Sequence, residues 1–197
     1  MIFSSTALKD AVVIDVERHG DDRGYLARTF CEQEFADHGL VTRFVQSSTI
    51  FSPLRGTLRG LHFQRPPHGE VKLVRCTRGA ARVTIVDLRP QSPTHLQWLG
   101  VELSPENGRL LYVPIGFAQG YQTLVDDTEV AYQMSHEYVP DAATGVRWDD
   151  PAFGIEWPAA RPRIISARDR SWPDHETCSP PAPAAGPPVA AAVPRGR

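Results

Sequence analysis

The stretch VKLVRCTRGAARVTIVDL occupies residues 71–88. Two short runs rich in β-branched residues, 71–76 and 81–88, flank the turn signal Thr77-Arg78-Gly79. Runs of this length and composition, bounded by turn residues, are typical of β-strands. The stretch therefore predicts two strands joined by a tight connection.

Similar runs follow downstream, separated by Arg89-Pro90, by residues 105–108 and by Asp126-Asp127. Only residues 31–39 have the pattern of a helix, with Gly39 placed to end it. Many short strands without intervening helices favour an antiparallel sandwich or barrel, and a jelly roll is the compact solution. We therefore expect an all-β jelly roll with few short helices, whose further strands lie at 96–103, 109–114 and 128–134.

Composition narrows the class of protein. The 197 residues carry a net charge of −2, which indicates no surface for nucleic acid or anionic membrane. No apolar run approaches the roughly 20 residues of a membrane helix, and the N-terminus lacks the pattern of a signal peptide. Three widely spaced cysteines, Cys31, Cys76 and Cys178, fit free thiols better than a disulfide framework. We expect a cytoplasmic protein without nucleic-acid or membrane partners.

The end of the chain differs in composition from the rest. The segment SPPAPAAGPPVAAAVPRGR contains six prolines, six alanines and no aromatic residue. Such a segment cannot bury enough apolar surface to offset the entropy lost on ordering. The sequence predicts one domain over residues 1–175 and a disordered tail over residues 176–197.

Strand alternation places two polar side chains on apolar faces. It puts Lys72 with Val74 and Cys76, and it puts Tyr132 with its apolar neighbours two residues away. A lysine there needs a partner for its ammonium group. Either its stem packs while its head reaches solvent, or the cation points into a barrel interior that holds an anion or a polarised carbonyl. Tyr132 is equally compatible with a core tyrosine whose hydroxyl is satisfied.

His62, in the strand-like segment LRGLHFQ, has three open roles: a structural residue, a metal ligand or a proton-transfer base. His68 and Glu70 could join it at a metal, but Gln119 stands where a closing imidazole would be needed, so we expect no metal. A neutral imidazole accepts a proton near neutral pH. An ammonium group can stabilise an enolate and a phenol can return the proton. His62, Lys72 and Tyr132 together would suit an epimerase or isomerase acting next to a carbonyl.

Seven motifs follow one another in order: RGTLRGLHFQ, EVKLVRCTRGA, VDLRPQSPT, GVELSPEN, LYVPIGFAQGYQTL, GVRWDDPAFGIEWP and ISARDRSWPD. Together, from about Asp10 to Asp174, they resemble the dTDP-4-dehydrorhamnose 3,5-epimerase family of deoxysugar synthesis. The resemblance implies a homodimer of cupin-type jelly rolls (double-stranded β-helices) that uses no metal or organic cofactor. It also implies a dTDP-linked 4-keto-6-deoxyhexose as substrate, whose C3 and C5 protons are acidified by the C4 ketone.

The resemblance also implies catalytic roles. His62 is the base, and Asp169 of the SARD motif orients it. Lys72 of the KLVR motif stabilises the enolate. Tyr132, on the strand after the FAQGY turn, is the general acid on the other face.

Four further residues match substrate-binding positions of the family. Arg23, Gln46 and Arg59 match positions that contact the nucleotide or its phosphates, and Tyr138 matches an aromatic residue near the sugar. Arginine suits a diphosphate because it offers two parallel donors. In a regular strand Arg59 and His62 would point to opposite faces. Either Gly60 permits a bulge between them, or Arg59 serves a neighbouring pocket.

Three positions depart from the family pattern. The usual FAHGF is FAQGY here, so the amide of Gln119 replaces an imidazole in the pocket. Val83 replaces an aspartate that would hold Lys72, and Ser48 replaces an asparagine. An amide cannot accept and pass on a proton as an imidazole can. We expect proton abstraction next to C4 to survive, while epimerisation of both carbons stays open.

Several functions remain in competition. The leading hypothesis is an epimerase acting at C3, C5 or both carbons of a dTDP-4-keto-6-deoxyhexose. A second is a single-centre epimerase of an antibiotic deoxysugar pathway. A third is a cupin that binds a nucleotide sugar without turning it over, and a metal-dependent cupin enzyme is the fourth.

Overall fold

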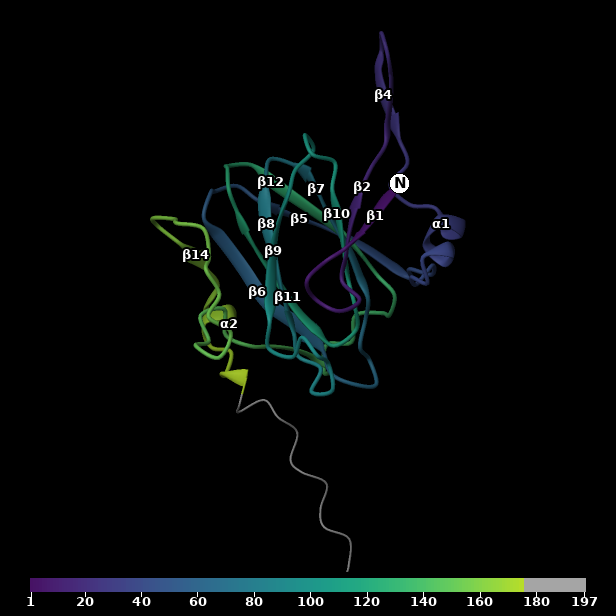
Figure 1. Cartoon of the computed structure of the whole chain (residues 1–197). Helices are drawn as coiled ribbons and strands as arrows, with labels where there is room; N and C mark the ends of the chain where they lie inside the picture. Colours follow the sequence, from purple (N-terminus) through teal and green to yellow (C-terminus); the bar gives the residue numbers. More distant parts are fainter. Residues whose placement is uncertain (176–197) are drawn as a thin grey trace, which may run out of the picture.

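The computed structural model describes residues 1–175, which form two facing β-sheets (Figure 1). The first sheet contains β1 (Ile2–Ser5), β2 (Val12–Asp15), β5 (Gln46–Ser52), β7 (Lys72–Arg78), β10 (Leu110–Val113) and β12 (Thr128–Met134). The second contains β6 (Thr57–Gln64), β8 (Ala81–Asp87), β9 (Trp98–Leu103), β11 (Phe117–Thr123), β13 (Ala143–Gly145) and β14 (Ile164–Ile165). A separate hairpin contains β3 (Arg18–Asp21) and β4 (Gly24–Ala27), and the helices are α1 (Glu32–Asp37) and α2 (Ala167–Arg170). The predicted tail, residues 176–197, lies outside the described residues.

The strand order is that of a jelly roll. It runs β1-β2-β10-β7-β12-β5 in the first sheet and β13-β6-β11-β8-β9 in the second, so most neighbours are far apart in sequence. All these pairs are antiparallel, and only β14 lies parallel to its partner, β6. The expectation of an all-β jelly roll is confirmed.

The stretch 71–88 forms β7 and β8, as predicted, but the two strands do not pair with each other. β7 lies between β10 and β12 in the first sheet, whereas β8 lies between β11 and β9 in the second. The turn at Gly79, with φ +70°, therefore carries the chain from one sheet to the other. This crossover places the inward-facing side chains of β7 and β8 against each other.

The two helices are short, and only the first was expected. α1 begins after Cys31 and is followed by Gly39 in the left-handed conformation, with φ +68°, as the sequence predicts. Within residues 1–175 neither helix is long and apolar enough to cross a membrane. The FAQGY segment, expected at a turn, is part of strand β11, which pairs with β8 along its whole length and with β6 on its other side.

Apolar side chains fill three layers. Strands of both sheets meet in the central layer, which includes Val74, Val83 and Val130. α1 and its flanking phenylalanines cover the outer face of the first sheet around Leu73. The segment around Phe153 covers the outer face of the second sheet. Lys72 and Tyr132 share strand faces with central-layer residues, so both point between the sheets.

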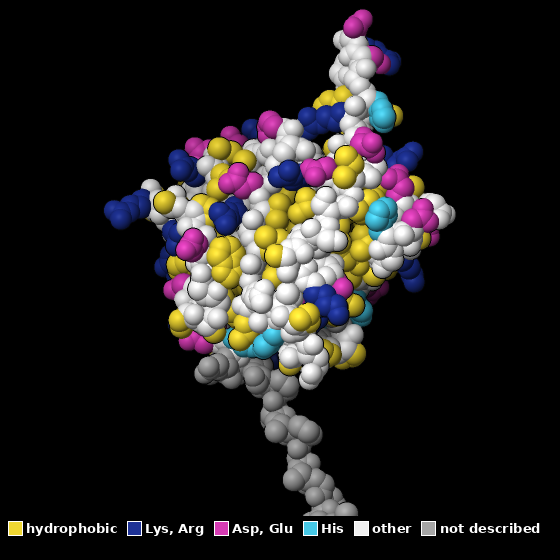
Figure 2. All heavy atoms as spheres, viewed as in Figure 1, with side chains coloured by type: hydrophobic (Ala, Val, Ile, Leu, Met, Phe, Trp, Pro, Cys, Tyr) yellow, Lys and Arg dark blue, Asp and Glu magenta, His cyan; other side chains and the backbone are white. Residues whose placement is uncertain are grey.

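The β3–β4 hairpin stands apart from this core. It rises clear of the body, with charged side chains near its tip (Figures 1 and 2). Two apolar side chains on β4 are also exposed, Tyr25 by 58% and Leu26 by 75%. The guanidinium of Arg18 stacks on the Tyr25 ring at 4.6 Å. Within the described chain, the hairpin therefore exposes two apolar side chains to solvent.

A bulge in β6 reorients its side chains. Gln119 pairs with His62 and Tyr121 pairs with Arg59, so two residues of β6 lie opposite the single residue Gly120 of β11. Gly60, with φ +125°, occupies the bulge, and a Cβ atom built on it would overlap the Cα of Gly120. Of the two alternatives that the sequence left open, the structure therefore has the bulge at Gly60, and both Arg59 and His62 line the same cavity.

Alanine at position 60 should therefore destabilise the fold for two reasons: the backbone there has a positive φ, and the Cα of Gly120 leaves no room for a methyl group. Gly24 is a matched control because it has φ +130° but no neighbouring atom within 4 Å of a built Cβ. We expect Gly60→Ala to lower the free energy of unfolding by at least about 2 kcal/mol more than Gly24→Ala, measured by urea denaturation. Equal losses would mean that β11 shifts to accommodate the methyl group.

Candidate active site

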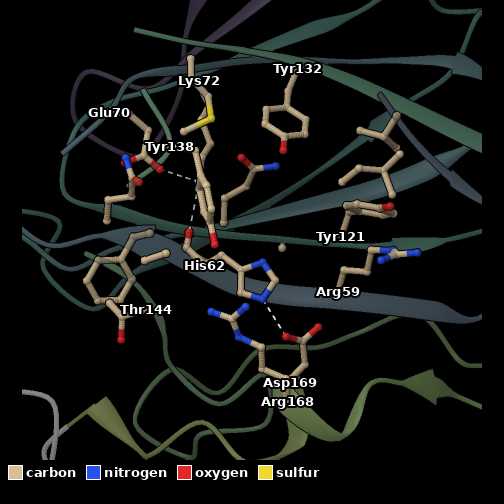
Figure 3. A pocket seen from close by; sticks show the side chains of 18 of the residues that line it. Arg59, His62, Glu70, Lys72, Tyr121, Tyr132, Tyr138, Thr144, Arg168 and Asp169 are labelled. Carbon is tan, nitrogen blue, oxygen red and sulfur yellow. Dashed lines mark hydrogen bonds and ion pairs between the residues drawn. The ribbon is translucent and has the colours of Figure 1, made fainter. Parts of the chain in front are cut away.

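A cavity of about 320 Å³ opens between the two sheets (Figure 3). β6 and β11 form one wall, β7 and β12 form the opposite wall, and α2 closes part of the rim. Its volume is in the range of small-molecule sites. Seven of the nine predicted site residues line it: Arg59, His62, Lys72, Gln119, Tyr132, Tyr138 and Asp169.

His62 and Asp169 form a hydrogen-bonded pair at the rim. The Nε2 atom of His62 lies 2.7 Å from Oδ1 of Asp169, although the two residues are 107 positions apart in sequence. An ionised carboxylate can only accept, so Nε2 donates and the neutral ring keeps its lone pair on Nδ1. The predicted pairing of these residues is present, and it leaves Nδ1 as the proton-accepting atom.

Asp169 is a buried carboxylate held by several donors. Burial alone would raise its pKa, but hydrogen bonds from His62, from the Gly60 backbone N–H and from the Trp172 indole lower the pKa of Asp169 below its usual value. The short helix α2 presents the carboxylate, and Ser166 caps this helix by accepting from the Asp169 N–H. Asp169 is thus fixed in the ionised form that orients an imidazole.

Lys72 has a carboxylate partner that the sequence reasoning did not assign. Its Nζ lies 2.9 Å from Oε1 of Glu70 and donates to the backbone carbonyl of His62 at 3.3 Å. Lys72 therefore has a carboxylate partner even though Val83 replaces the aspartate of the family pattern. Val83 is fully buried in the central apolar layer and does not line the cavity. The ammonium of Lys72 points into the interior and is not carried outward to solvent, since its side chain is only 12% exposed.

Tyr132 projects into the cavity from the wall opposite His62 (Figure 3). It lies on β12, next to Val74 of β7, whereas His62 lies on β6 in the other sheet. Tyr121 lies on β11, in the wall of His62, and burial raises the pKa of its phenol, although a contact with the Ser52 hydroxyl partly offsets this effect. A flat molecule between the walls would therefore meet an imidazole on one face and a phenol on the other.

Two predicted residues lie outside this cavity of a single chain. Arg23 is on the exposed β3–β4 hairpin, where it pairs with Asp21. Gln46 begins β5, and its side-chain oxygen accepts from the backbone N–H of Tyr138 at 2.9 Å. Gln46 thus holds the segment that carries Tyr138 into the cavity.

Sequence reasoning missed other lining residues. Tyr121, Thr144 and Arg168 line the cavity, and Arg168 stacks on Trp172 at 5.1 Å. Arg168 precedes Asp169 in the SARD motif, so its position next to a predicted site residue was the one sequence signal that it lines the cavity. Thr144 lies on the three-residue strand β13, which is too short for a periodicity signal.

The proposed metal-ligand candidates beside His62 are separated. The His68 ring packs edge-on against His136 at 5.2 Å, and Glu70 pairs with Lys72. Over the described part of the chain, no three histidine, cysteine or acidic side chains are placed to hold one metal ion.

Comparison with known proteins adds to this geometry. The model of a family described as dTDP-4-dehydrorhamnose 3,5-epimerase matches residues 5–177. A relative with that name from Methanothermobacter thermautotrophicus is 46% identical over 173 residues, which cover 86% of this chain and 92% of the relative.

Solved structures are similar as well. The dTDP-4-dehydrorhamnose 3,5-epimerase of Bacillus anthracis, with TDP and PPi bound, has a TM-score of 0.84 and 40% identity, covering 88% of this chain and 98% of that one. ChmJ, a 3'-monoepimerase from Streptomyces bikiniensis in complex with dTDP-quinovose, has a TM-score of 0.81 and 31% identity, covering 87% of each chain. Both 3,5-epimerases and a 3'-monoepimerase are thus among the similar proteins.

The depressed pKa of Asp169 predicts a pH-dependent contribution to stability. Because folding lowers this pKa, the contribution is complete above the unfolded value of about 3.9 and is lost as the pH falls through the folded value. Asp169→Asn should therefore be clearly destabilising at pH 7 and less so near pH 3, as measured by urea denaturation across that range. Asp22→Asn, at the exposed hairpin tip, is the control. A destabilisation independent of pH would contradict the prediction.

Proposed function

The chain belongs to the dTDP-4-dehydrorhamnose 3,5-epimerase family, and on that premise we propose that it epimerises a dTDP-linked 4-keto-6-deoxyhexose with His62 as the base. The reaction is an isomerisation next to the C4 ketone. The observation that carries the proposal is the placement of the His62–Asp169 pair and Tyr132 on opposite walls of one cavity, with Lys72 on β7, the strand next to that of Tyr132.

His62 takes the first proton. A C–H bond next to the ketone breaks, its proton moves to Nδ1 of His62, and its electron pair forms an enolate across to the C4 oxygen. The imidazolium that results is stabilised by Asp169, whose carboxylate already holds Nε2. This support is available throughout the neutral pH range because Asp169 stays ionised there.

Lys72 stabilises the enolate. Its ammonium lies inside the cavity wall, where a low local dielectric strengthens its attraction for a developing negative charge. Tyr132 then donates its phenolic proton to the carbon from the opposite face, which inverts the centre. Solvent water returns a proton to the tyrosinate and removes the one held by His62, so the enzyme ends as it began.

Substrate binding uses the open end of the cavity. Arg59 and Tyr138 line it and are exposed, so they are free to meet the diphosphate and the sugar of an incoming nucleotide sugar. Arginine provides parallel donors for phosphate oxygens, and an aromatic ring provides a flat apolar surface.

A homodimer accounts for the position of Arg23 and for the exposure of Leu26 on the β3–β4 hairpin. Arg23 lies far from the cavity of its own chain, and Leu26 is exposed. We place the hairpin against a second copy of the chain, so that Leu26 is covered and Arg23 approaches the partner's cavity. We also assign the protein to the cytoplasm, because Cys31 and Cys76 are free thiols.

A single-centre epimerase is the second candidate, and Gln119 favours it. Gln119 lies directly across from His62 in the β6–β11 register and lines the cavity. Its side-chain oxygen is buried and has no hydrogen-bond partner among the described residues. An amide at this position cannot relay a proton, so one of the two carbons has one acid–base group fewer. A nucleotide-sugar-binding protein without turnover is the remaining alternative.

Exchange in D₂O tests all three functions. We expect purified protein with dTDP-4-keto-6-deoxyglucose to lose the C3 and C5 proton signals in NMR spectra, as a 3,5-epimerase does. Loss of one signal would establish a single-centre enzyme. Binding without any exchange would rule out catalysis on this sugar.

Replacement of the base supplies the matching variant. His62→Asn should slow exchange by roughly 10²- to 10⁴-fold, because the ring that accepts the proton is gone while a polar side chain of similar reach remains. Binding of dTDP should change little, since His62 faces the sugar. His95→Asn, a change of the same type outside the cavity, is the control. Unchanged exchange in His62→Asn would reject the assignment of the base.

The dimer has its own test. Leu26→Asp places a charge where the hairpin would be covered, so we expect sedimentation to show a shift from dimer to monomer while the single-chain fold is kept. Ile2→Asp, another exposed apolar position, is the control. A monomeric wild-type protein would contradict the proposed dimer.

A further inference from the structure

Resting on this proposed function, we propose that Glu70 is a positioning residue that aims the Lys72 ammonium at the enolate oxygen. Glu70 does not need to touch the substrate for this role. It acts through Lys72, and the contacts of the two side chains carry the inference.

Two acceptors fix the direction of the Lys72 ammonium. An ammonium carries three N–H donors in a tetrahedral arrangement. One meets Oε1 of Glu70 at 2.9 Å and another meets the carbonyl oxygen of His62 at 3.3 Å. Two fixed acceptors leave the third donor with one direction, so the Lys72 group is orientated before the substrate arrives. Figure 3 shows Glu70 and Lys72 on the same side of the cavity.

The carboxylate of Glu70 is buried. The Glu70 side chain is 3% exposed, and its Oε2 atom is buried with no hydrogen-bond partner within residues 1–175. A buried carboxylate is costly unless a cation compensates it, and Lys72 is the cation that pairs with it. Buried ion pairs contribute little net stability compared with apolar replacements. The pair is therefore better explained by orientation of a reacting group than by stability.

Few carboxylates are available in the cavity to hold the Lys72 ammonium. Glu70 and Asp169 are the carboxylates that line the cavity, and Asp169 is committed to His62. Val83, where the family resemblance places an aspartate, is part of the apolar core. Glu70, in the segment just before β7, thus supplies the carboxylate that β8 lacks. Glu70 precedes Lys72 by two residues, which places both side chains on the same side of an extended chain.

The test is a double-mutant cycle on solvent exchange. Glu70→Met keeps the length of the side chain and removes its acceptor atoms. We expect it to lower the exchange rate constant at saturating substrate by between about 10- and 100-fold, with dTDP affinity unchanged. In a Lys72→Met background the same change should have no further effect, because the group on which Glu70 acts is gone. The double variant replaces the pair with apolar side chains and so should fold.

Two further variants separate positioning from a structural role. Glu70→Gln keeps an acceptor oxygen without the charge, so its loss of exchange should be smaller than that of Glu70→Met. Glu129→Met removes a partly buried carboxylate on β12 that contacts Thr77 outside the cavity, and it should leave exchange unchanged.

The outcomes are distinguishable. If the wild-type protein exchanges and Glu70→Met exchanges equally fast, the positioning role is overturned while the proposed function stands. If the effects of Glu70→Met and Lys72→Met multiply in the double variant, Glu70 acts independently of Lys72, which also overturns it. If the wild-type protein shows no exchange, the proposed function and the positioning role fall together.

Discussion

The close approach of two backbones, at Gly60 in β6 and Gly120 in β11, is the constraint on which the active site depends. No side chain fits between them, so β6 makes room for an extra residue opposite Gly120. Without the bulge, Arg59 and His62 would point to opposite faces of the sheet. With it, the guanidinium of Arg59 and the imidazole of His62 share one cavity. A steric requirement of the backbone thus decides which side chains face this cavity.

The charged groups of the cavity near the Gly60 bulge form two pairs. Asp169 contacts His62 from the C-terminal segment, and Glu70 contacts Lys72 from the segment just before β7. Each carboxylate is buried and lies within hydrogen-bond distance of one nitrogen of its partner. This division fits chemistry in which a proton leaves one atom while negative charge accumulates on another. The phenol of Tyr132, on the facing sheet, completes the arrangement from the other side.

Much of the fold could be predicted because strand alternation and turn residues are local signals. The period of two placed Lys72 on an apolar strand face and Gly60 made a bulge one of two alternatives, but the direction of the Lys72 ammonium and the choice of the bulge stayed open. The assignment of β7 and β8 to opposite sheets could not be predicted, because it depends on contacts between distant strands. The pairing of Asp169 with His62 came from family resemblance alone, since a four-residue helix has no periodicity. The Glu70–Lys72 pair could have been predicted, because residues two positions apart in an extended chain point to the same side.

The sequence distance between His62 and Asp169 has a consequence for biosynthesis. The two partners are 107 residues apart, and α2 is the last helix of the described chain. A nascent chain emerging from the ribosome carries His62 on β6 long before the carboxylate that orients it has been translated. β11, which supplies the other side of the bulge, also comes late. The molecule therefore completes its His62–Asp169 pair only when nearly the whole domain has been synthesised, so fragments that end before α2 would contain His62 without its carboxylate partner.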